Sequence, residues 1–350
     1  MKKYYTRACN FYYGSSSKNL IKKKLALPLC GNINIAFDEV EIFTRNKNKI
    51  SSFVINIKKI NSLKTILKKK ISKDIKNISA KRNKFTDPTI MGILNMTPDS
   101  FSDGGKFNSS SKAFKQIDFM IKSGAEIIDV GGESTRPGSK NILPTQEWKR
   151  IKSVVKKFKK KYRKFFLSID TRKSEIMNKA ILYNADIIND VSGFKYDKKS
   201  LSVVRNKKIW KIIHHMQGTP DNMQINPKYK NVLLDIYDFF EDTISKIKTK
   251  NKVNKIILDP GIGFGKNLKH NLILLSKVSL FHSLGFPILI GSSRKRFISQ
   301  ISGSFDTKER IGGTLSSILF TLAQGVQIFR VHNVKEVKQG ILVFKNLLSQ

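Results

Sequence analysis

From residue 89 onward, the chain alternates short apolar runs with longer segments in which apolar residues recur every three or four positions. Each run is five or six residues long and predicts a buried strand. The segments between them predict amphipathic helices, as in the spacing of Leu233, Ile236, Phe240 and Ile244. The eight predicted strands are residues 90–95, 126–131, 165–170, 186–190, 210–215, 255–259, 286–290 and 326–331.

This order of elements predicts an α/β fold. Strands that are apolar throughout are typical of a parallel sheet covered by helices, and eight such units in residues 87–350 match a (β/α)8 TIM barrel. An open, doubly wound sheet is the alternative. The first predicted strand is not followed by the glycine fingerprint of dinucleotide-binding open sheets, so we favour the barrel.

Residues 1–86 form a separate, basic N-terminal extension with a weaker pattern. They carry 21 basic and 4 acidic side chains. Segments 33–43 and 51–57 could pair as a hairpin, and 63–78 could form a basic helix, but no motif assigns them a role. The stretch before Asp38 has basic, hydroxyl and aromatic residues and no acidic ones, so import into an organelle is not excluded.

The high positive charge alone does not identify the protein as a nucleic-acid-binding protein. Lys and Arg number 66 against 26 Asp and Glu, a formal charge of +40, but only twelve of the basic residues are Arg. Specific nucleic-acid recognition favours Arg, so we interpret the lysines as a solvated shell that reflects compositional drift. The uncharged segment 311–329 contains too many Gly, Ser, Thr and Gln residues for a membrane span.

The two cysteines also bear on the cellular compartment. Neither Cys9 nor Cys30 lies at disulfide-framework or zinc-site spacing. A reducing compartment fits such a chain, and we expect a cytoplasmic location.

Polar side chains recur at or just beyond the ends of the predicted strands. They are Asn95, Asp129, Asp170, Asn189, His215, Asp259, Lys295, Arg330 and His332. In a barrel, the loops that follow the strands form one mouth, so these side chains should converge on a single cavity. Carboxylates and amides suit a flat, nitrogen-rich ring, while Lys, Arg and His suit anionic groups. The set points to an aminopyrimidine ligand with a phosphate tail.

Several long motifs resemble those of the dihydropteroate synthase family. They are MGILNMTPDSFSDGG at 91–105, GAEIIDVGGESTRPG at 124–138, DPGIGFGKN at 259–267, SRK at 293–295 and RVH at 330–332. The resemblance extends from residue 88 to about residue 348, in order. It implies a transferase of folate biosynthesis, which condenses 6-hydroxymethyl-7,8-dihydropterin diphosphate with 4-aminobenzoate to give 7,8-dihydropteroate and diphosphate.

The resemblance also implies roles for individual residues. Asp129, Asp170, Asn189, Asp259 and Lys295 would bind the pterin, and Asn95, Thr135, Arg330 and His332 would face the diphosphate. Asn95 would also bind Mg²⁺, which commonly reaches proteins with substrate phosphates. We assign catalysis to Asp170, which would stabilise cationic carbon, together with Asn95, Arg330 and His332.

The family pattern places 4-aminobenzoate among residues of two Gly-, Ser- and Pro-rich loops and their neighbours. The implied contacts are Phe101, Thr135, Arg136, Pro137, Phe264, Ser293 and Lys295. Sulfonamides, which mimic 4-aminobenzoate, would compete there. We expect small-molecule substrates and a homodimer, with no specific nucleic acid and no membrane as partners.

Two alternatives remain at this point. A pterin-binding barrel that presents a folate for methyl transfer would keep the Asp and Asn contacts but would have little use for Arg330 and His332. A nucleic-acid-binding protein on a relic barrel would use the +40 charge instead.

Overall fold

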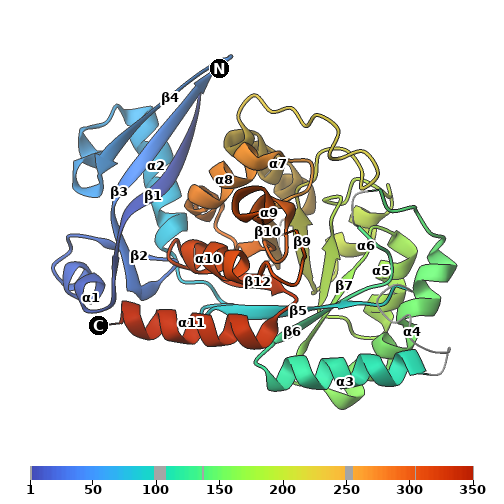
Figure 1. The fold of residues 1–350 in the computed structure, drawn as a ribbon. Coiled ribbons are helices and arrows are strands. Elements are labelled where there is room, and N and C mark those ends of the chain that lie inside the picture. Colours follow the sequence, from blue (N-terminus) through green and yellow to red (C-terminus); the bar gives the residue numbers. More distant parts are fainter. Residues whose placement is uncertain (1, 98–107, 136–137, 249–254, 304, 350) are drawn as a thin grey trace.

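The computed structural model describes residues 2–97, 108–135, 138–248, 255–303 and 305–349. Figure 1 shows a barrel of strands and helices, with a smaller N-terminal unit packed against one side.

The eight predicted strands form one sheet that curls into a nearly closed barrel. Their order is β10-β9-β8-β7-β6-β5-β12-β11, and every neighbouring pair is parallel. A parallel bridge between Leu258 and Ile288 joins the two ends of the sheet. The strands are β5 (Thr89–Asn95), β6 (Ile127–Gly131), β7 (Phe166–Asp170), β8 (Ile187–Asp190), β9 (Trp210–His214), β10 (Ile256–Asp259), β11 (Leu289–Ile290) and β12 (Ile328–Val331). The predicted TIM-barrel class is therefore confirmed.

Helices cover the outside of the barrel. Polar residues begin two of them: the side chain of Asn231 accepts the amide of Leu234, and that of Asn267 accepts the amide of His270. The helices are α3 (Asn108–Lys122), α4 (Pro144–Lys161), α5 (Ser174–Leu182), α6 (Ser200–Arg205), α7 (Val232–Ile247), α8 (Leu268–Ser276), the 3-10 helix η3 (Val278–Leu284), α9 (Arg296–Ser302), α10 (Ile311–Leu322) and α11 (Val334–Leu348).

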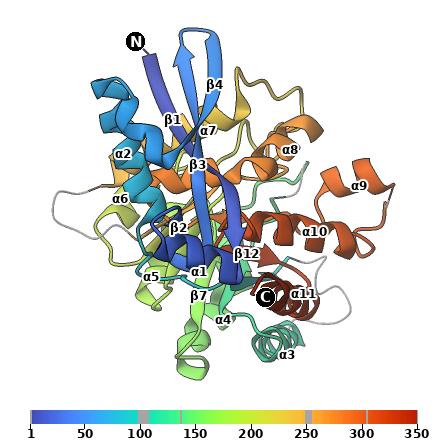
Figure 2. The same cartoon turned by 90° about the vertical axis from the view of Figure 1, so that its left-hand side faces the viewer.

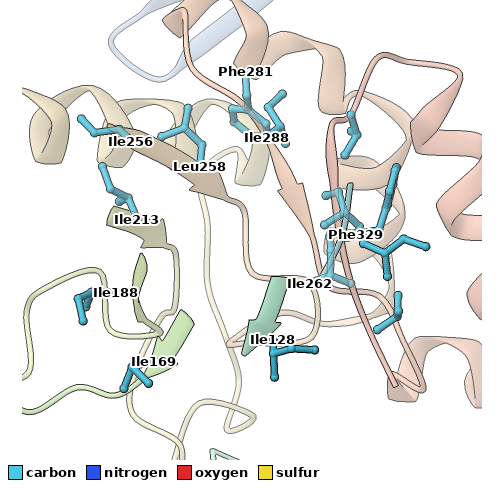
Figure 3. Close-up of a cluster of buried hydrophobic side chains, with 14 of the residues drawn as sticks. Ile128, Ile169, Ile188, Ile213, Ile256, Leu258, Ile262, Phe281, Ile288 and Phe329 are labelled. Atoms are coloured by element: carbon cyan, nitrogen blue, oxygen red, sulfur yellow. The ribbon is translucent and has the colours of Figure 1, made fainter. Parts of the chain in front are cut away.

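Side chains along each strand alternate between two apolar clusters. One cluster lies between strands and helices and includes Ile128, Ile169, Ile188, Ile213 and Phe329 (Figure 3). The other cluster fills the barrel near the amino ends of the strands. It contains Phe85, Met91, Ile127, Ile187, Ile212, Ile257, Leu289 and Ile328. The period of two in a strand therefore fixes which residues face the barrel axis.

The N-terminal unit is a four-stranded antiparallel sheet with two helices, seen face-on in Figure 2. Its elements are β1 (Lys2–Tyr13), α1 (Gly14–Lys22), β2 (Leu27–Leu29), β3 (Asn32–Asn46), β4 (Lys49–Asn56), the 3-10 helix η1 (Ile57–Ser62) and α2 (Thr65–Ser79). The expected hairpin occurs as β3 and β4. The sequence pattern did not predict β1, which pairs with β3 along most of its length.

Polar and aromatic contacts join this unit to α7. Asp238 accepts hydrogen bonds from the hydroxyl of Tyr5 at 3.0 Å and from Arg45 at 2.9 Å, and it also pairs with Lys3. The rings of Tyr5 and Tyr237 meet edge to face at 5.1 Å. Both tyrosines are buried. The N-terminal unit therefore packs against the barrel through a buried interface.

No helix in the described residues is long and apolar enough to cross a membrane.

We predict that Asp238→Ala lowers the free energy of unfolding by about 1–2 kcal/mol, because Tyr5 and Arg45 lose a charged partner at the interface. Urea denaturation measures this change. The matched control is Asp242→Ala on the same helix, whose exposed pair with Lys246 should contribute about 0.3 kcal/mol. Equal effects of the two substitutions would contradict the proposed interface.

Candidate active site

Alternate residues of each strand point toward the barrel axis. The same alternation that places isoleucine near the amino ends of the strands places polar side chains at their carboxyl ends, which form the mouth of the barrel. In five strands, the residue two positions after an inward-facing isoleucine is polar, so both point toward the barrel axis. The pairs are Ile127 and Asp129, Ile187 and Asn189, Ile212 and His214, Ile257 and Asp259, and Ile328 and Arg330.

Four of these polar side chains, Asn189, His214, Asp259 and Arg330, line a cavity of about 730 Å³ at the carboxyl ends of the strands. Ten of the predicted site residues line it: Asn95, Thr135, Asp170, Asn189, Asp259, Phe264, Ser293, Lys295, Arg330 and His332. The predicted convergence on one mouth therefore holds for residues from seven of the eight strand ends and the loops beyond them.

Arg330 joins two carboxylates across the barrel. Its Nε donates to Asp129 Oδ2 at 2.6 Å, and its Nη2 donates to Asp170 Oδ2 at 2.9 Å. Asn189 also donates to Asp129 Oδ2, at 3.2 Å. Burial alone would lower the pKa of Arg330, but the two carboxylates raise it above its usual value. The guanidinium therefore remains cationic and fixes the spacing of the two acids.

Burial makes two carboxyl groups of the cavity weaker acids than usual. It raises the pKa of Asp170 to about 7 although Arg330 opposes this shift. It raises the pKa of Asp259 to about 6, while the Gly261 amide and Lys295 act in the opposite direction. Both groups thus titrate close to neutral pH, where a small change in the surroundings alters their charge.

Lys295 lies above the aromatic wall of the cavity. Its Nζ is 3.8 Å from the centroid of the Phe264 ring. Burial and the nearby charge of Arg330 lower the pKa of Lys295 to about 8. A lysine in this state can donate a hydrogen bond to a ring, and it loses its proton under mildly alkaline conditions.

Ser293 and His332 meet at the rim of the cavity. The Ser293 hydroxyl lies 3.1 Å from His332 Nδ1, and it also accepts the His332 amide at 3.3 Å. The two contacts hold the imidazole beside Arg330, so the rim carries two groups that can contact an anion.

A buried cluster of charges joins the loops after β6 and β7. Glu133 lines the cavity and pairs with Arg172 at 2.9 Å and Lys173 at 2.8 Å. Lys173 also pairs with Glu147 at 2.6 Å. Burial acts to raise the pKa of Glu133, but the two cations lower it overall. The loop that carries Thr135 is thereby fixed to the loop that follows Asp170.

Comparisons with known proteins agree with this geometry. The sequence model of the pterin binding enzyme family matches residues 91–332 of this chain. The dihydropteroate synthase of Escherichia coli K12 is 40% identical over 263 residues, which cover 75% of this chain and 92% of the relative. The chain belongs to the dihydropteroate synthase family.

Two solved structures of the family extend the comparison. The Yersinia pestis dihydropteroate synthase, solved with a sulfonamide drug complex, is 36% identical with a TM-score of 0.71, covering 76% of this chain and 96% of that one. The Xanthomonas albilineans enzyme, solved with 4-aminobenzoic acid, is 31% identical with a TM-score of 0.69, covering 75% and 94%.

Asp129 and His215, which the sequence pattern places at the mouth, do not line the cavity, and three further predicted residues are outside the described part of the chain. Asp129 is fully buried beneath Arg330, and within the described residues its Oδ1 has no hydrogen-bond partner. Phe101, Arg136 and Pro137 lie outside the described residues.

Sequence reasoning missed several residues that line the cavity, among them Glu133, His214 and Lys266. His214 Nδ1 donates to the Val191 carbonyl oxygen at 2.9 Å, whereas neighbouring His215 faces the helix layer and contacts the Phe239 ring. Lys266 is buried, with Nζ 2.8 Å from the Phe264 carbonyl oxygen. Strand parity could have identified His214, because it follows the inward-facing Ile212 by two residues.

We predict that Asp259→Asn stabilises the fold at pH 7 by roughly 1–3 kcal/mol, because the folded state disfavours the charged carboxylate. The folded pKa of Asp259 lies above the unfolded value. The parent protein is therefore not destabilised by Asp259 below about pH 4, where the carboxyl group is protonated in both states. Its free energy of unfolding falls as pH rises through about 6, because the buried group then loses its proton.

Urea denaturation at several pH values measures this effect. The advantage of Asp259→Asn should shrink as pH falls toward 4. Exposed Asp242→Asn on α7 is the control and should change little at any pH. A variant less stable than the parent at pH 7 would contradict the role given to burial.

Proposed function

We propose that the chain is a dihydropteroate synthase, which condenses 6-hydroxymethyl-7,8-dihydropterin diphosphate with 4-aminobenzoate. The observation that carries this proposal is the single cavity that holds Asp170, Asp259 and Lys295 together with Arg330 and His332. The named relatives are dihydropteroate synthases, which supports this transferase activity over methyl transfer to or from a folate.

The pterin would bind in the buried half of the cavity. A carboxylate can hold the amino and ring N–H groups of an aminopyrimidine through two parallel hydrogen bonds. Asp259 is our candidate for this contact, with the Asn189 amide beside it and Lys295 donating to acceptors on the ring. Within the described residues, Asn189 Oδ1 is buried without a hydrogen-bond partner, which supports a ligand contact there.

The 4-aminobenzoate would bind closer to the mouth. Phe264 supplies an aromatic face, and Thr135 and Ser293 supply hydroxyl groups that line the same cavity. Phe101, Arg136 and Pro137 remain part of this proposed pocket on the family pattern alone. A relative solved with 4-aminobenzoic acid and another solved with a sulfonamide drug support competition by sulfonamides at this position.

The diphosphate would lie near Arg330 and His332, and we propose Mg²⁺ as the cofactor. The described residues contain no group of three His, Cys, Asp or Glu side chains that could hold a metal. The Asn95 amide, which lines the cavity, fits an ion that keeps its waters and arrives on substrate phosphates. When bound, Mg²⁺ would neutralise charge on the departing diphosphate.

The chemistry breaks the bond from the exocyclic pterin carbon to oxygen and forms a bond from that carbon to the arylamine nitrogen, which then loses a proton. Positive charge on the carbon is stabilised by the Asp170 carboxylate, while Arg330 attracts the leaving diphosphate. Arylamines are weak bases and are free nucleophiles near neutral pH, so the cavity requires no strong general base.

The remaining proposals concern partners and location. We propose a homodimer, which would cover exposed apolar side chains on the packed helices α10 and α11, such as Phe320 and Val343. We propose no specific nucleic-acid or membrane partner and a cytoplasmic location. Both cysteines are free thiols, as in a reducing compartment.

The activity is tested by incubating the purified chain with the pterin diphosphate, labelled 4-aminobenzoate and Mg²⁺. We expect labelled 7,8-dihydropteroate, and we expect Asp170→Asn to lower kcat/KM about 100-fold through lost charge stabilisation. Asp242→Asn is the control and should retain full activity. A folded protein that forms no labelled product would refute the proposed function.

The pH profile of kcat/KM tests the two assigned charges. Below about pH 7, Asp170 becomes protonated and stabilises the cation less, and above about pH 8, Lys295 loses the proton that it donates. We expect a bell with its maximum between these values. Asp170→Asn should abolish the acid limb and Lys295→Arg the alkaline limb; limbs that survive in both variants would contradict these assignments.

A further inference from the structure

A second cavity, of about 450 Å³, lies at the opposite end of the barrel. Phe166 begins β7 and Trp210 begins β9, two parallel strands of the barrel with β8 between them, so their side chains mark the amino-terminal face. Cavities of this size hold drug-sized ligands. Because the cavity of the proposed active site opens at the carboxyl ends of the same strands, the two are separate.

Half of this second cavity belongs to the N-terminal unit and the linker after it. Arg82 and Lys84 lie on one side, and Phe166, Trp210, Lys255 and Phe286 lie on the other. The family model matches only residues 91–332. The first side of the cavity therefore lies outside the part of the chain that the family model describes.

Aromatic rings in fixed positions form one wall. Phe85 is buried in the lower barrel, and its ring lies 4.9 Å from that of Trp210 and 5.8 Å from that of Phe166. Phe166 and Trp210 pack against that apolar cluster from its edge and are only partly buried. Their remaining surface, together with Phe286, faces the cavity and suits a planar apolar ring.

The charged part of the lining has one sign. Four cationic side chains contribute to it, and no acidic side chain does among the described lining residues. Lys84 Nζ lies 5.1 Å from the centroid of the Phe166 ring, so a cation stands directly beside the aromatic wall. Lys255 Nζ is held at the rim by the Lys208 carbonyl at 3.0 Å.

Arg82 anchors the linker to both parts of the fold. Its Nη1 donates to the Asn77 carbonyl at 2.9 Å, and its Nη2 donates to the His282 carbonyl in η3 at 3.3 Å. The side chain is 6% exposed. The linker wall is therefore fixed against the barrel, and the cavity is preformed.

We propose that this cavity is a second ligand site, which binds a planar aromatic anion. The ring would lie against Trp210 and Phe286, and its carboxylate or sulfonate would face Lys84 and Lys255. The role of the N-terminal unit and its linker would then be to form one side of this binding site.

The test uses the full chain and the fluorescence of Trp210. Trp148→Phe removes the other tryptophan and leaves Trp210 as the single reporter. The probe is 2-naphthoate, and its neutral isostere 2-naphthamide is the matched ligand. We expect saturable binding of the naphthoate at one site, with the amide bound several-fold more weakly.

Charge variants assign the signal to this cavity. The double substitution Lys84→Gln and Lys255→Gln should weaken the affinity for 2-naphthoate about five-fold or more and leave the affinity for 2-naphthamide unchanged. Lys152→Gln, an exposed lysine on α4, is the control and should have no effect. Equal binding of the two ligands, an unaltered affinity in the double variant, or a Trp210 signal that does not saturate would overturn the proposal.

Discussion

The guanidinium of Arg330, held between the carboxylates of Asp129 and Asp170, is the contact on which the geometry of the main cavity depends. Three strands, β12, β6 and β7, contribute one group each; the two carboxylates are buried, and the Arg330 side chain is 20% exposed. Such groups are costly to bury unless each charge has a partner. The pairing therefore allows a barrel with an apolar lower half to carry carboxylates at its mouth.

Because Arg330 contacts two of the carboxyl groups of the site and not the third, the three differ in their pairing. Asp129 is buried and pairs with Arg330 through one carboxylate oxygen. Asp170 shares Arg330 and has a raised pKa, and Asp259, also with a raised pKa, accepts the Gly261 amide and lies near more distant cations. Lys295 stands over Phe264 with a lowered pKa. Acid and base of nearly matched strength thus face one cavity, which suits a reaction that creates a cation and releases an anion.

The barrel was predictable because its strands are buried on both faces and read as continuous apolar runs, even where β11 has only two residues in strand geometry. The convergence of Asp170, Asp259, Lys295 and Arg330 followed from the position of each after a strand. The pairing partners of Arg330 did not follow, because they depend on distances across the barrel. The N-terminal unit was only partly predictable: β1 mixes polar and aromatic residues, and its burial is set by α7 and β3.

A double-mutant cycle between Arg330→Met and Asp170→Asn, read as the free energy of unfolding at pH 7, tests the central ion pair most directly. If Arg330 compensates the buried carboxylate, Arg330→Met alone should be strongly destabilising, and the double variant should recover more than about 1 kcal/mol of the summed loss. Additive effects within about 0.5 kcal/mol would show that the two groups do not depend on each other and would contradict this account.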